Sequence, residues 1–148
     1  MVREAKKEDL KGLLELYLFL HEDRIPENDE HLEKTWKTIV DDPNHHLIVN
    51  EIDGQIVSSC DLVIIPNLTR NVRPHAFVEN VVTHGDHRNK GYAGQCLDLA
   101  KKLAEQENCY KIMLATGSSD PKTHRFYQNV GYSNTIKTAY VQWLNMEG

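Results

Sequence analysis

The chain has 148 residues, enough for one domain of ordinary size that buries its own core. Hydrophobic residues make up 40% of it and charged residues 26%, with a formal net charge of −5. This balance is typical of globular proteins and argues against a nucleic-acid partner, which requires a basic surface.

Targeting and membrane signals are also missing from the sequence. No apolar run approaches the length of a membrane span, and the first nine residues are too charged to open a secretory signal. We therefore expect one cytoplasmic domain over residues 1–148, with no membrane partner.

The cysteine and histidine patterns predict neither disulfides nor a metal. Cys60, Cys96 and Cys109 are odd in number and lack metal-like spacing. The histidine pairs, at 45–46 and at 84 and 87, have neither the partners nor the helical context of a zinc site.

Hydrophobic periodicity divides the chain into helices and strands. Asp53-Gly54 is a strong hairpin signal between two strands, and Pro121 and Gly131 suit the first turn and the end of a helix. The expected elements are helices at 9–20 and 28–40, strands at 46–52, 55–65 and 76–83, a helix at 91–106, a strand at 111–115, a helix at 121–131 and a strand at 136–144.

With a first strand ahead of the helix at 9–20, these elements predict the order β-α-α-β-β-β-α-β-α-β. The fold class is α/β (α+β mixed), with a central mixed sheet flanked by helices. Only the connection through the helix near Gly91 makes a parallel pair of strands.

The segment from Glu79 to Gly94 is the most informative, because a strand leads through a loop to glycines at a helix start. The free N–H groups and the positive dipole end of such a helix form a ready anion site. Gly91 and Gly94 permit close backbone approach, and Arg88 and Lys90 add positive charge. We therefore expect a phosphate-bearing ligand here.

Arg88-x-x-Gly91-x-Ala93 resembles the Q/R-x-x-G-x-G/A pyrophosphate motif of the GNAT N-acetyltransferase superfamily. The segment from Arg125 to Tyr132 resembles the family's second motif, FYxxxGF. The stretch from residue 108 through residue 134 is locally similar to glucosamine-6-phosphate N-acetyltransferases.

The resemblance implies the GNAT fold, in which the strands ending near Thr83 and beginning near Lys111 splay apart. It also implies an enzyme that transfers the acetyl group of acetyl-CoA to a primary amine of a small molecule by direct attack. The implied contacts to acetyl-CoA come from Val81, Val82, Thr83, Arg88, Asn89, Lys90, Gly91, Tyr92, Ala93 and Gly94.

Such a reaction needs a base for the ammonium and an acid for the departing thiolate. Glu79 is the first candidate base, because it stands in an otherwise apolar strand where we expect it to be buried. A purely structural Glu79 is the alternative, and His84, at the end of the same strand, is the second candidate base.

Tyr127 is the candidate general acid, directed at the coenzyme A sulfur. Its alternative is a core tyrosine with a satisfied hydroxyl. The asparagine that the family often places four residues earlier is Thr123 here, which leaves one cofactor contact open.

The acceptor is less well indicated. Arg70 and Arg73 lie in a loop between two strands and could hold a carboxylate or phosphate of the substrate, or serve only solubility. Two other functions stay open: acetylation of a protein lysine or N-terminus, and a non-catalytic acetyl-CoA sensor. The alternating strand at 136–144, with a terminal tryptophan at 143, further predicts a homodimer.

Overall fold

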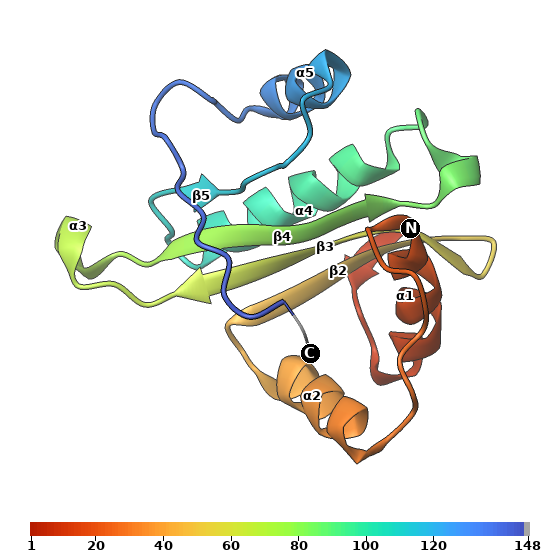
Figure 1. Cartoon of the computed structure of the whole chain (residues 1–148). Helices are drawn as coiled ribbons and strands as arrows, with labels where there is room; N and C mark the ends of the chain where they lie inside the picture. The colour runs from red at the N-terminus through yellow and green to blue at the C-terminus, as the bar shows by residue number, and fades with distance from the viewer. Residues whose placement is uncertain (147–148) are drawn as a thin grey trace. The chain divides into compact units, whose positions relative to one another are not determined.

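The computed structural model describes residues 1–146 and divides the chain into two compact units (Figure 1). The first unit is Met1–Leu114, and the second begins at Ala115. One domain over residues 1–148 stays a prediction.

The first unit is built on a five-stranded sheet in the order β1-β2-β3-β4-β5. The first four strands pair antiparallel, whereas β4 and β5 pair parallel. The mixed sheet and its parallel step after the third long strand are thereby confirmed. The strands are β1 (Val2–Glu4), β2 (His45–Ile52), β3 (Gln55–Ile65), β4 (His75–Thr83) and β5 (Ile112–Met113).

The helices expected at 9–20, 28–40 and 91–106 are present, whereas the short helices at 7–9, 69–72 and 85–87 were not predicted. Asp29 caps α2, since its side chain accepts a hydrogen bond from the Leu32 N–H at 2.9 Å. No helix within residues 1–146 is long and apolar enough to cross a membrane. The helices are η1 (Lys7–Asp9), α1 (Leu10–Leu16), η2 (Tyr17–Phe19), α2 (Glu30–Asp41), α3 (Thr69–Val72), η3 (Gly85–His87) and α4 (Tyr92–Gln106).

Helices cover the two faces of the sheet (Figure 1). On one face the Asn50 side chain of β2 reaches α4, where its amide donates to the Gln95 side chain at 2.7 Å. Residues at alternate positions point to the other face, where α1 and α2 close a core. Its members are Leu13, Leu16, Trp36, Leu47, Val49, Ile56 and Val82.

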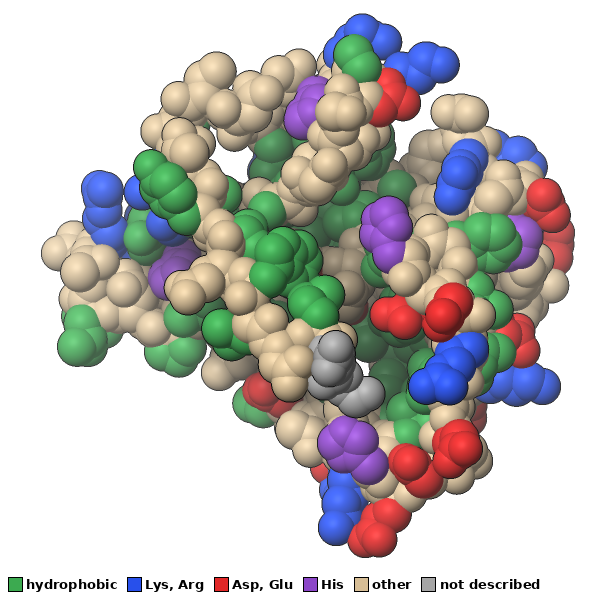
Figure 2. Space-filling view, viewed as in Figure 1, with side chains coloured by type: hydrophobic (Ala, Val, Ile, Leu, Met, Phe, Trp, Pro, Cys, Tyr) green, Lys and Arg blue, Asp and Glu red, His purple; other side chains and the backbone are tan. Residues whose placement is uncertain are grey.

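The outer surfaces of α1 and α2 carry mixed acidic and basic side chains (Figure 2). This is the solvent-facing side of two amphipathic helices. The Trp36 indole turns inward instead and donates a hydrogen bond to the Lys7 carbonyl at 3.0 Å. That bond joins α2 to the turn that precedes α1.

The second unit contains α5 (Pro121–Val130). Asp120 accepts a hydrogen bond from the Lys122 N–H at 2.9 Å, Pro121 occupies the first turn, and Gly131 ends the helix with φ 112°. Pro121 and Gly131 match the expected helix signals, and the Asp120 N-cap adds a third that was not predicted.

The predicted strand at 136–144 is wrong, because residues 136–144 form no strand. Large apolar side chains in this segment lie exposed, Tyr140 at 94% and Trp143 at 75%. Alternating hydrophobicity only describes a segment that suits a sheet edge. A strand forms only when another strand pairs with it, and no strand of the described sheet pairs with this segment.

Candidate active site

The site begins where β4 loses one of its neighbours. β4 pairs with β3 from His75 to Thr83, but it pairs with β5 only at Ala76 and Phe77. Beyond Phe77, the outer edge of β4 has no strand partner among the described residues. The predicted splay is thus present, and Val81, Val82 and Thr83 lie on its open side. Main-chain groups on such an edge are available to an extended ligand.

A β-bulge lies in the middle of the open edge. The register between β3 and β4 shifts between Ser59 and Asp61, and Asn80 adopts a left-handed conformation with φ 54°. Bulges bend a strand and re-aim its side chains, and they are frequent beside active sites. Here the bulge turns β4 at the point where its second neighbour leaves.

The loop after β4 leads directly to the N-terminus of α4. Asn89 and Gly91 both have left-handed backbones, with φ 63° and 81°. Arg88, Asn89 and Lys90 are exposed, and Gly91 is the N-cap of the helix. The first-turn N–H groups of Tyr92, Ala93 and Gly94 have no carbonyl one turn earlier in the helix to bond. The predicted anion site therefore has the backbone and charge that it requires.

Asn50 fixes this helix start to the sheet, a role that the sequence reading missed. Its side chain is fully buried, and its amide donates to the Gln95 side chain and to the Tyr92 carbonyl at 3.4 Å. A polar residue inside a buried strand was the available signal, because a buried amide must find partners.

Glu79 lies on β4 directly opposite Asp61 of β3 and one residue before the bulge. The expectation that it is buried is wrong, because its side chain is exposed. Position 79 belongs to the bulge-bearing half of the strand, where β5 no longer covers β4. The case for Glu79 as a base therefore depends on its place beside the open edge and no longer on desolvation.

His84 follows β4 and is half-buried, with its ring centroid 4.3 Å from that of Phe19. Its Nδ1 accepts a hydrogen bond from the Asp86 N–H at 3.1 Å. In the neutral ring the proton must then sit on Nε2. The Nδ1 lone pair of His84 is therefore engaged by the Asp86 N–H and is not open to a substrate amine.

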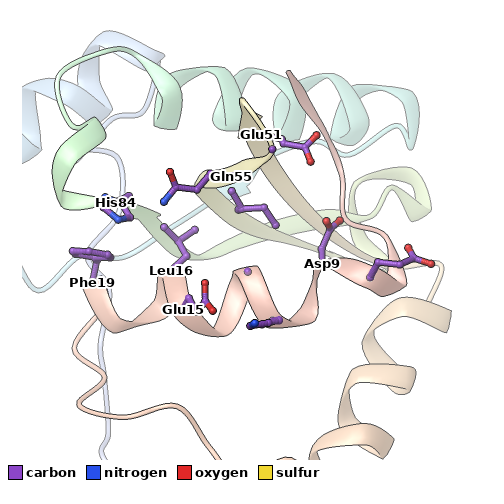
Figure 3. Close-up of a pocket in the computed structure, with 12 residues that line it drawn as sticks. Asp9, Glu15, Leu16, Phe19, Glu51, Gln55 and His84 are labelled. Carbon is purple, nitrogen blue, oxygen red and sulfur yellow. The ribbon is translucent and has the colours of Figure 1, made fainter.

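His84 also borders a pocket of about 430 Å³ between α1 and the β2–β3 hairpin (Figure 3). Phe19 and His84 lie together at one end, and the rest of the lining is mostly polar. Glu79 does not line it. This pocket is therefore separate from the open edge of β4.

Comparison with known proteins agrees with this arrangement. The model of the Acetyltransferase (GNAT) family matches residues 10–132, most of the chain. The chain belongs to the GNAT family. The resemblance read from the two motifs and the predicted fold class are both confirmed.

Several solved GNAT structures share the fold of this chain. A putative acetyltransferase from Agrobacterium tumefaciens is 36% identical, with a TM-score of 0.89, over 97% of this chain and 99% of that one. Glucosamine-6-phosphate N-acetyltransferase from Arabidopsis thaliana is 21% identical, with a TM-score of 0.85, over 98% of both chains. At that identity the likeness concerns the fold alone.

A curated relative matches by sequence. Glucosamine 6-phosphate N-acetyltransferase from Trypanosoma brucei brucei is 30% identical over 79 residues, 53% of this chain. The match spans 52% of that relative, about half of its length.

The structure does not bring Arg70 and Arg73 together with Glu79. Arg70 lies within α3 and has a left-handed backbone, and Arg73 is the C-cap of α3, before the start of β4. Since a strand rises about 3.3 Å per residue, His75 alone is about 13 Å from Glu79. Arg73 donates to the carbonyl groups of Asn108 and Cys109 at 3.2 and 3.1 Å. A substrate-binding role for the two arginines stays a prediction.

Tyr127 lies in the second unit of the GNAT chain, half-buried in α5. Its ring contacts those of Phe126 and Tyr132, with centroids 5.0 and 6.3 Å apart. Thr123, at the position where the family often has asparagine, accepts a hydrogen bond from the Ser118 hydroxyl at 3.2 Å. The role of Tyr127 as an acid stays a prediction.

Proposed function

We propose that this GNAT protein transfers the acetyl group of acetyl-CoA to a primary amine of a small molecule. The observation that carries the proposal is the open edge of β4 leading into the anion site at the start of α4. An extended, phosphate-bearing cosubstrate needs both features in this order along the chain.

The residues present fit acetyl-CoA. The main chain of Val81 to Thr83 would pair with the extended part of the cosubstrate, and the N–H groups after Gly91 would hold its phosphates. Arg88 and Lys90 would add charge at the same place. The thioester supplies an activated acetyl group, and the chain must supply position, a base and stabilisation of the oxyanion.

Direct attack is favoured over an acyl-cysteine intermediate. Burial raises the pKa of the Cys96 thiol to about 11, and burial also raises the pKa values of Cys60 and Cys109. A thiol needs a lowered pKa to act as a nucleophile near neutrality. None of the three cysteines has one.

Glu79 is the base that the arrangement favours. It stands beside the bulge on the open strand, where an incoming amine meets the acetyl group. His84 is less suitable, since its accepting nitrogen is bonded to the Asp86 N–H. The simplest donors to an oxyanion would be the main-chain N–H groups of Val81 or Val82.

The test is release of coenzyme A thiol with a panel of primary amines, for the wild type and for Glu79→Gln. Glutamine keeps the shape but cannot accept a proton, so turnover should fall about 100-fold. The loss should shrink at alkaline pH, where more of the amine is already deprotonated. An unchanged pH–rate profile would place the base elsewhere, and His84→Ala would be next.

A matched control separates this loss from a fold defect. Glu33→Gln makes the same chemical change at an exposed position of α2 and should leave turnover unchanged. Thiol release with no amine of the panel, despite acetyl-CoA binding, would favour the sensor alternative instead.

A further inference from the structure

Asp61 of β3 is a buried carboxylate whose hydrogen bonding is incomplete. The residue is 8% exposed, and its Oδ1 has no hydrogen-bond partner among residues 1–146. Its Oδ2 has two long contacts, 3.3 Å to His45 Nε2 and 3.4 Å to Asn80 Nδ2. Charge-assisted bonds are normally about 2.7–2.9 Å. A buried carboxylate held this loosely is costly unless a further donor reaches it.

The position of Asp61 relates it to the proposed site. It lies directly across the sheet from Glu79, and directly opposed residues on adjacent strands share a face. Adjacent strands are about 4.8 Å apart, so Asp61 lies about 5 Å behind Glu79, away from the open edge. A group bound at Asp61 would therefore be part of the same acceptor molecule as an amine at Glu79, but it would not be the nitrogen that is acetylated.

The neighbours of Asp61 indicate that its negative charge acts on this face of the sheet. Burial chiefly raises the pKa of Tyr17, in η2, and the Asp61 charge raises it further. The hydrogen bond to Asp61 raises the pKa of His45, although burial opposes the rise. His45 is the one partner of Asp61 within the described chain that can carry a positive charge, and their contact is long, at 3.3 Å.

One alternative is that the His45–Asp61 pair only joins β2 to β3. That reading leaves Oδ1 unpaired and gives Asn80 no role. Asn80 is exposed, sits on the bulge and makes one weak contact with Oδ2. It is therefore the partner that a stronger donor from solvent can replace.

We propose that Asp61 binds a second, cationic group of the acceptor, whose ammonium replaces the Asn80 amide at the carboxylate and gives Oδ1 a donor. This inference rests on the proposed function. The two nitrogens of the acceptor must then span the distance of about 5 Å between Asp61 and Glu79. Each bond of an extended carbon chain advances it by about 1.2 Å, so the preferred acceptor is a diamine whose nitrogens are separated by three or four carbon atoms. Asp61 is then a specificity-determining residue.

The experiment compares 1,4-diaminobutane with 1-aminobutane, which has the same length but lacks the second ammonium. The readout is kcat/KM for each amine at saturating acetyl-CoA. The wild type should prefer the diamine at least tenfold, mainly through KM. Asp61→Asn should reduce the ratio of the two kcat/KM values to about one, because the amide carries no charge. A wild type without a preference, or a preference that survives Asp61→Asn, overturns the proposal.

His45→Gln is the matched control, because it breaks the same pair but keeps the carboxylate. The site predicts that this variant retains the diamine preference, whereas a purely structural pair predicts that both variants lose the same activity and thermal stability. Equal losses would overturn the proposal. If Asp61→Asn does not fold, Asn80→Gly provides the test. This variant removes the competing amide from a left-handed position that glycine tolerates, so the KM for the diamine should fall. An unchanged or higher KM would overturn the proposal.

The two proposals fail in different ways. If neither amine is acetylated, the proposed function is wrong for these substrates, and calorimetry of amine binding then tests Asp61 alone. Tighter binding of the diamine to the wild type, lost in Asp61→Asn, would support the site without catalysis. Equal binding of both amines, or binding of neither, would overturn it.

Discussion

Gly91→Glu tests the anion site by adding a negative charge at the start of α4. The cost to folding should be small, because no atom lies within 4 Å of the place that an added Cβ would take and only the left-handed backbone, φ 81°, is strained. A non-glycine residue in that conformation costs about 1–2 kcal/mol. The cost to binding should be larger. Two like charges about 5 Å apart repel by about 3 kcal/mol at an effective dielectric constant of about 20, which corresponds to about 100-fold in Kd.

Gly54→Glu provides the matched control. Gly54 also has a left-handed backbone, φ 80°, with nothing within 4 Å of an added Cβ, but it lies in the β2–β3 hairpin. Both variants should lose similar stability in thermal unfolding, and only Gly91→Glu should lose acetyl-CoA affinity in calorimetry. Near-normal affinity of Gly91→Glu, or equal losses in both variants, would refute the phosphate-site reasoning.

Three further predictions follow from single contacts or segments. Tyr127→Phe should lower turnover about tenfold or more but leave acetyl-CoA affinity intact, since only a hydroxyl is lost; full activity would remove Tyr127 as the acid. The Arg3 guanidinium bonds Asp9 at 2.7 and 3.0 Å and lowers the pKa of that carboxyl group. The stability that this pair contributes should be present above about pH 4 and lost as the pH falls through the lowered pKa of Asp9. Asp9→Asn should therefore lower the free energy of unfolding by about 2 kcal/mol at pH 7, and by progressively less as the pH falls, which unfolding titrations at acid pH would measure. If the exposed segment at 136–144 pairs with a second copy, sedimentation at micromolar concentration should show a dimer that Trp143→Ala weakens; a wild type that stays monomeric would contradict this.

Much of the first unit could be read from the sequence because its signals are local. Asp53-Gly54 fixed the hairpin between β2 and β3, and both residues have the left-handed backbone that this turn requires, with φ 50° and 80°. Gly91 marked the start of α4 for the same reason. The strand at 136–144 failed because pairing depends on an edge elsewhere, which no local pattern contains.

The site divides in the same way. The glycine N-cap and the exposed basic residues of the loop before α4 could be predicted, since glycines, basic residues and a helix start are contiguous; anion binding there stays a prediction. The exposure of Glu79 could not, because it depends on where β5 stops pairing with β4. Asp61 was missed as one carboxylate in a strand of apolar and small residues, and its importance arises only from the register that places it opposite Glu79.

The open edge of β4 must stay ordered although only one strand supports it, and β3 supplies that support through side chains as well as main chain. Ser58, fully buried, donates its hydroxyl to the Val82 carbonyl at 2.9 Å and contacts the Thr83 hydroxyl at 3.0 Å. These bonds act on the half of β4 that β5 leaves unpaired. A strand held from one side in this way loses little further conformational entropy when an extended cosubstrate pairs with its other side, and such preorganisation favours binding. The buried polar residues of β3 therefore help to hold the unpaired edge of β4 in the extended conformation that a cosubstrate would pair with.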